Sequence, residues 1–81
     1  VADAVVELVS EIPRSGTVTF RHLSRGLVDR IEIVVRFLAV LELYKQGVVE
    51  IDQLGTFGDI HVGWRPGADP SDVDLIAAYE G

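Results

Sequence analysis

The pattern of apolar positions predicts a helix at the start of the chain. Four apolar residues recur at the i, i+3, i+4, i+7 spacing of one helix face: Val5, Leu8, Val9 and Ile12. Acidic side chains lie on the other side of the expected helix. Pro13 and Gly16 follow, and both residue types favour a helix end. We therefore predict an amphipathic helix over the first dozen residues.

Two short elements are expected between this helix and a longer one. Residues 17–20 are β-branched or aromatic, which favours a brief strand. Residues 21–27 are expected to contain a two-turn helix that Gly26 ends. The chain should therefore pass through a strand and a short helix before it reaches its longest element.

Local signals mark both ends of a long third helix. Asp29 stands three residues before Glu32, the spacing of a capping box at a helix start. Lys45 supplies a cation to the expected last turn, and Gly47 favours a left-handed stop. The pattern predicts a helix from about Asp29 to Gln46.

After this helix the apolar period changes from 3.6 to 2. Residues 48–53 and residues 60–65 each alternate between apolar and polar or small side chains, as half-buried strands do. Between them, residues 55–58 read Gly-Thr-Phe-Gly, which predicts a turn. We therefore expect an antiparallel hairpin.

The residues after the hairpin are expected to form a tail. Pro66 and Pro70 end the second strand, and Ser71 is expected to cap a short, loosely docked C-terminal helix. The order of helix, short strand, helix, long helix and hairpin predicts an α+β fold, a winged helix with a two-stranded antiparallel wing. We assign the winged-helix domain to residues 1–65 and the tail to residues 66–81.

The third helix carries more apolar surface than one helix face needs. Eleven of the fourteen residues from Ile31 to Tyr44 are apolar, and at about 100° per residue nine of them cover an arc of roughly 220°. A surface helix needs a stripe only a little over 100° wide. Two interpretations remain open: a central helix that is covered on more sides than usual, or a helix with one flank that docks on another protein.

Charge argues against a nucleic-acid partner. The chain has 13 acidic and 7 basic residues, a net charge of -6. Residues 1–46 hold six of each sign, so the excess lies in residues 47–81, with seven acidic residues and one basic residue. A DNA-binding winged helix needs polar or basic groups on its third helix and cations on its wing. A DNA-binding winged-helix domain of a regulator remains the alternative, with a small basic patch of Arg14, Arg21 and Arg25.

The sequence shows no pattern typical of catalysis or metal binding. It has no cysteine, and its two histidines, His22 and His61, are far apart. We expect no enzyme activity and no cofactor. The chain also lacks methionine, even at its first position, which predicts that it is a piece of a longer protein.

Three stretches together resemble a known family. They are residues 37–49 (FLAVLELYKQGVV), the single Gln53, and residues 57–60 (FGDI). This combination, with similarity over about residues 15–65, resembles the C-terminal domain of bacterial segregation and condensation protein A (ScpA), a kleisin. Each stretch alone is too short to be specific.

The resemblance implies a winged-helix domain that binds another protein. In kleisins this domain docks on the ATPase head of an SMC (structural maintenance of chromosomes) protein and so bridges the SMC dimer in chromosome condensation and segregation. ScpB would bind parts of the parent protein that are absent here. The expected location is the cytoplasm, at the nucleoid through SMC, with no membrane and no direct nucleic-acid contact.

The resemblance places the SMC contact on the third helix and the strand after it, which corresponds to Phe37, Leu41 and Gln53. We add Val40 and Tyr44 because they lie on the same flank of the helix. Alternatives remain for these residues, since Phe37 and Leu41 can also build the domain's own core and Gln53 can satisfy a turn carbonyl. Self-association through the same apolar flank is a further alternative.

Overall fold

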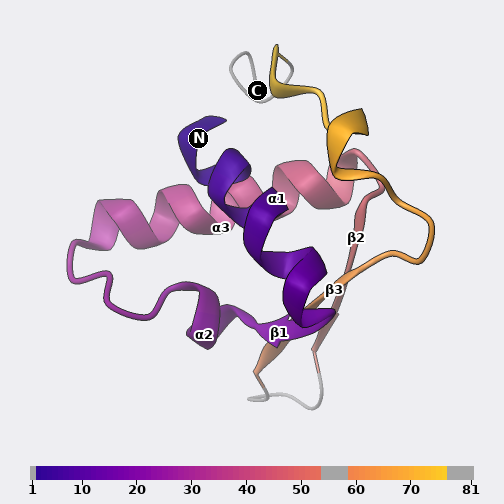
Figure 1. Ribbon diagram of the computed structural model, residues 1–81. Coiled ribbons are helices and arrows are strands. Elements are labelled where there is room, and N and C mark those ends of the chain that lie inside the picture. The colour runs from indigo at the N-terminus through magenta and orange to yellow at the C-terminus, as the bar shows by residue number, and fades with distance from the viewer. Residues whose placement is uncertain (1, 54–58, 77–81) are drawn as a thin grey trace.

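The fold is a winged helix, as predicted (Figure 1). The structure is a computed structural model that describes residues 2–53 and 59–76. Three strands form one antiparallel sheet in the order β1-β3-β2. The elements, in chain order, are α1 (Ala2–Ser15), β1 (Thr17–Thr19), α2 (Phe20–Leu23), α3 (Arg30–Lys45), β2 (Val49–Gln53), β3 (Ile60–Trp64) and the 3₁₀ turn η1 (Pro70–Asp72).

Helix α1 is longer than predicted because Pro13 does not end it. The helix continues to Ser15 with Pro13 inside its last turn. Pro13 lacks the amide that would donate to the carbonyl of Val9, so the helix continues through it with one hydrogen bond fewer. The end is set by Gly16, which has a φ of +82° and donates its N–H to the carbonyl of Ile12 at 2.8 Å.

The sheet presents one buried row of side chains to the helices. Val62 in the central strand β3 is fully buried and pairs with Val18 of β1 and Ile51 of β2. Both neighbours are partly buried against the same core. Because directly opposed residues in antiparallel strands point to the same face, these three side chains form the floor of the core.

Helix α3 has the ends that the sequence predicts. Asp29 accepts a hydrogen bond from the N–H of Ile31 at 2.9 Å and so caps the first turn. Gly47 follows the helix with a φ of +80° and donates to the carbonyl of Tyr44 at 3.0 Å. The chain then turns directly into β2.

The core lies where α1 and α3 pack together over the sheet. On α3 only one sector faces this core, and Ala39, Val40 and Leu43 are completely buried there. The other buried apolar side chains are Ala2, Ala4, Val5, Leu8, Ile12, Leu23, Val48, Val49 and Val62.

The tail differs from the prediction in its cap. Asp69, not Ser71, caps η1: its Oδ1 accepts from both the N–H and the Oγ of Ser71 at 2.9 Å. The backbone hydrogen bond, and after it the hydroxyl bond, lowers the pKa of the Asp69 carboxyl below its ordinary value. The expected C-terminal helix is described only at residues 75–76, which are helical. Its continuation, including Ala77, and the predicted turn at residues 55–58 lie outside the described residues.

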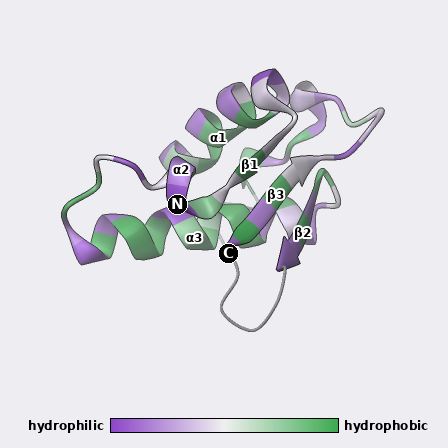
Figure 2. Ribbon diagram, turned by 90° about the horizontal axis from the view of Figure 1, so that it is seen from below, coloured by the Kyte–Doolittle hydropathy of each residue, from purple (hydrophilic) through white to green (hydrophobic). Residues whose placement is uncertain are grey.

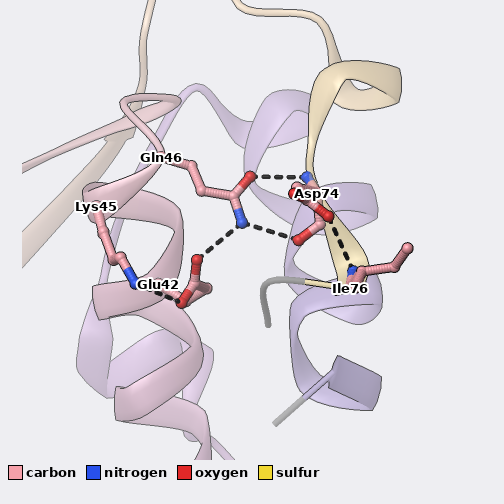
Figure 3. A network of polar contacts seen from close by, with 5 residues as sticks. All are labelled: Glu42, Lys45, Gln46, Asp74 and Ile76. Atoms are coloured by element: carbon pink, nitrogen blue, oxygen red, sulfur yellow. Dashed lines mark hydrogen bonds and ion pairs between the residues drawn. The ribbon is translucent and has the colours of Figure 1, made fainter. Parts of the chain in front are cut away.

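Gln46 anchors the tail to the end of α3 (Figure 3). Its Nε2 donates to the carbonyl of Asp74 at 2.9 Å, and its Oε1 accepts from the Asp74 N–H at 2.7 Å. The same Nε2 donates to Glu42 at 2.8 Å, and Lys45 Nζ lies 4.0 Å from the other oxygen of Glu42. Glu42 is only 8% exposed, and these two partners offset the cost of its burial.

Candidate protein-docking surface

A stripe of exposed apolar side chains runs along α3. The spacing of three or four residues keeps these side chains on one side of the helix over about 20 Å. Figure 2 shows the ribbon of α3 coloured as hydrophobic over most of its length. The stripe, called the α3 stripe below, consists of Ile31 (72% exposed), Val34 (50%), Leu38 (44%), Leu41 (39%) and Tyr44 (56%).

The α3 stripe is the part of the apolar helix surface that the domain does not use for its own core. Ala39 and Leu43 face α1 and the sheet from the opposite side of the helix. Because the helix is apolar on nearly all sides, burial of one sector leaves another sector exposed. Contiguous exposed apolar residues of this kind mark interaction sites on many proteins.

The structure places the predicted contact residues in three different environments. Leu41 and Tyr44 belong to the α3 stripe. The prediction for Val40 as a surface contact is wrong, because this side chain is completely buried in the core. Phe37 is partly buried, and its ring meets the ring of Phe20 edge to face, with centroids 5.5 Å apart.

Gln53 lies apart from the α3 stripe. It is exposed at the end of β2, opposite Ile60 in the register of the hairpin. It is four residue steps along the strand from Val49, a length of about 13 Å. The sequence prediction missed the N-terminal half of the stripe, which consists of Ile31, Val34 and Leu38.

A shallow groove connects the α3 stripe to β2. It has a volume of about 540 Å³, and Tyr44 stands at its edge on the α3 side. Arg65 and Glu50 form an ion pair at 3.7 Å across its β2 side. The stripe and the start of β2 therefore form one continuous surface. The groove is lined by Tyr44, Lys45, Val49, Glu50, Ile51 and Arg65.

Acidic side chains dominate the wing, as the sequence predicts. Glu50 and Asp52 are exposed on β2, and Figure 2 shows the far end of this strand as hydrophilic. Arg21, one member of the predicted basic patch, forms an ion pair with Asp59 at 2.8 Å. Its charge is therefore partly neutralised by the wing itself.

The described residues contain no group of three or more histidine, cysteine, aspartate or glutamate side chains that is arranged to hold a metal ion. His22 has one acidic neighbour, Glu11, at 3.8 Å between Nε2 and Oε1. No helix in residues 2–53 or 59–76 is both long enough and apolar enough to cross a bilayer.

Comparison with known proteins identifies the family. The family model described as segregation and condensation protein ScpA matches residues 2–65. The chain belongs to the ScpA family. The match ends at the end of the wing, so it contains the whole α3 stripe and leaves out the tail that Gln46 anchors.

Two curated relatives carry the name segregation and condensation protein A. The ScpA relative from Halothermothrix orenii is 40% identical over 65 residues, which cover 80% of this chain and 26% of that protein. The ScpA relative from Macrococcus caseolyticus is 32% identical over 62 residues, which cover 76% of this chain and 26% of that protein. The chain thus spans about a quarter of the length of these relatives. No solved structure matches it.

Proposed function

We propose that this domain is a non-catalytic docking module that binds the ATPase head of an SMC protein through the α3 stripe. Membership of the ScpA family supports a role in chromosome segregation and condensation. The observation that carries the proposal is the apolar character of the exposed side of α3, from Ile31 to Tyr44. Of the contacts predicted from the sequence, Leu41 and Tyr44 lie on this surface. The proposal adds Ile31, Val34 and Leu38 to them.

Burial of the stripe would supply part of the binding free energy that a stable complex needs. Full burial of a large aliphatic side chain contributes roughly 1.5–3 kcal/mol, and each stripe residue is about half exposed already. Five such side chains therefore offer roughly 4–8 kcal/mol before the costs of association are subtracted. Polar contacts from the groove beside β2 would add orientation and specificity.

Phe37 and Gln53 have secondary places in this proposal. Phe37 borders the stripe, and its contact with Phe20 ties α3 to the start of α2. Gln53 stands at the far end of β2, where a partner that extends beyond the groove would reach it. Neither residue is needed for the apolar area of the stripe.

The alternative of a DNA-binding winged helix fits the surface poorly. The third helix of such a domain enters the major groove and presents polar side chains to base edges. Here the exposed side of α3 carries Leu38 and Leu41 at its middle, and the wing beside it carries Glu50 and Asp52. The leucine side chains could not satisfy the donors and acceptors of the base edges, and the carboxylates would be repelled by phosphates.

In the parent protein this domain would be one end of a bridge across the SMC dimer. The relatives are about three times as long as the chain, which leaves room for regions that contact the second SMC subunit and ScpB. This role would place the protein in the cytoplasm, at the nucleoid through SMC.

Calorimetric titration of the domain against an isolated SMC ATPase head tests the proposal. We expect saturable binding with one domain per head and no measurable binding to duplex DNA at physiological ionic strength. Absence of head binding would contradict the proposal. DNA binding that weakens steeply with salt would favour the regulator instead, and sedimentation of the free domain checks for self-association through the stripe.

A further inference from the structure

A second surface feature lies on the other side of α3, between its first half and α1. This depression, called the α1–α3 groove below, has a volume of about 350 Å³. That volume is at the low end of the range for ligand pockets, so it suits one or two side chains rather than a large molecule. The groove is lined by Asp3, Ala4, Glu7, Leu27, Ile31, Glu32, Val35 and Arg36.

The α1–α3 groove has an apolar floor. Leu27 and Val35 are partly buried in its lining, and Ile31, the first residue of the α3 stripe, forms the edge that the groove shares with the stripe. Val28, next to Leu27 in the chain, is 94% exposed beside it. An aliphatic side chain that entered the groove would therefore lose contact with water on several sides at once.

The rim of the α1–α3 groove is acidic. Asp3 and Glu32 are exposed, one on each helix. Among the described lining residues, the cation is Arg36, and it is already bound to Glu7 at 2.7 Å with only 15% of its side chain exposed. The two remaining carboxylates have no ion-pair partner among the described lining residues and form a negative rim around an apolar floor.

We propose that the α1–α3 groove binds a cationic, apolar segment of another protein. One or two aliphatic side chains of the segment would pack on Leu27 and Val35, and flanking lysine or arginine side chains would pair with Asp3 and Glu32. Charge complementarity selects this occupant, because an anionic or neutral polar segment would leave the carboxylates unpaired or repelled. The site adjoins the proposed SMC contact at Ile31, but Leu27, Val35 and the two carboxylates lie outside the α3 stripe.

A peptide titration followed by NMR tests this proposal. The probe is a synthetic peptide of about twelve residues with leucine and lysine at helical spacing, and its twin has glutamate in place of lysine. We expect the lysine peptide to shift the backbone amides of Ala4, Leu27 and Val35 in the labelled domain, with saturation. The glutamate peptide should leave them unchanged.

Charge reversal then distinguishes binding in the α1–α3 groove from unspecific attraction of a cationic peptide to an acidic protein. The double variant Asp3→Lys with Glu32→Lys should weaken binding of the lysine peptide about tenfold and create binding of the glutamate peptide. The control variant, Glu50→Lys with Asp52→Lys, makes the same change in net charge on the wing, far from the groove (Figure 1). It should bind the lysine peptide about as well as the unmodified domain does.

Asp3 and Glu32 also lie in the first turns of α1 and α3, where carboxylates stabilise the helix dipole. The milder variant Asp3→Asn with Glu32→Gln therefore accompanies the reversal, and it should weaken binding of the lysine peptide by a smaller factor.

The proposal is overturned if the chemical-shift changes centre on the α3 stripe or the wing. It is also overturned if the wing reversal weakens binding as much as the groove reversal. Head binding by the groove variants is expected to be normal, so the result does not depend on the SMC proposal.

Discussion

The ring of Phe37 meets the ring of Phe20 edge to face, with centroids 5.5 Å apart and ring planes at 88°. This contact joins the middle of α3 to the first residue of α2 at the border of the α3 stripe. A residue that the family resemblance assigns to the partner contact is therefore held by the domain itself. We expect that the main role of Phe37 is to hold α3 in position.

The aromatic pair should be energetically coupled. Phe37→Ala and Phe20→Ala should each lower the free energy of unfolding by about 2 kcal/mol, less than in a full core because both rings are only partly buried. In a double-mutant cycle measured by urea denaturation, the coupling should be about 0.5–1.5 kcal/mol. Strictly additive effects would show that the edge-to-face contact contributes nothing beyond burial.

Two neighbouring residues of α3 should respond differently to truncation. Val40 is completely buried, so Val40→Ala should lower the free energy of unfolding by about 2 kcal/mol. Leu41 is 39% exposed, and Leu41→Ala should cost less than about 1 kcal/mol although it removes more atoms. Chemical denaturation of the two variants checks this order, and a reversed order would mean that the assignment of the core side of α3 is wrong.

The tail should loosen when Gln46 is shortened. In Gln46→Ala the N–H and the carbonyl of Asp74 both lose their partner, at a cost of about 1–1.5 kcal/mol. Hydrogen exchange at the Asp74 amide should therefore be about tenfold faster. Exchange at Val62 in the central strand should change less, through the loss of the Gln46 bond to the buried Glu42 alone. Equal acceleration at both amides would indicate global destabilisation, and an unchanged Asp74 amide would contradict the anchor.

The cap of η1 should depend on pH. Hydrogen bonds from Ser71 lower the pKa of the Asp69 carboxyl below its ordinary value of 3.8. A carboxyl with a lowered folded pKa contributes stability that is complete above the ordinary value and is lost as the pH falls through the lowered value. The amide resonance of Ser71 should titrate with a midpoint below 3.8. A midpoint at or above 3.8 would mean that the cap does not form.

The two ends of α3 could be predicted because short-range signals determine them. Asp29 caps the helix through an amide two residues away, and Gly47 supplies a left-handed conformation that other residues rarely adopt. The cap of η1 has a comparable local signal: Asp69 precedes Pro70, and proline is favoured in the first turn of a helix.

The side of α3 that faces the core could not be predicted. The helix is apolar on nearly all sides, so periodicity gives no preference between the sectors of Val40 and Leu41. Packing against α1 and the sheet decides this, and it depends on the whole fold. The contact between Gln46 and Asp74 joins residues 28 positions apart and has no local signal either.

The affinity of single-residue variants of the α3 stripe for an SMC ATPase head tests the central claim most directly. Leu38→Arg and Leu41→Arg place a charge in the middle of the stripe, and Val6→Arg is a matched control at a 51% exposed valine on α1. We predict that each stripe variant stays folded by circular dichroism and binds the head at least about tenfold more weakly, whereas Val6→Arg binds normally. Normal head binding by both stripe variants would contradict the claim that α3 carries the docking surface.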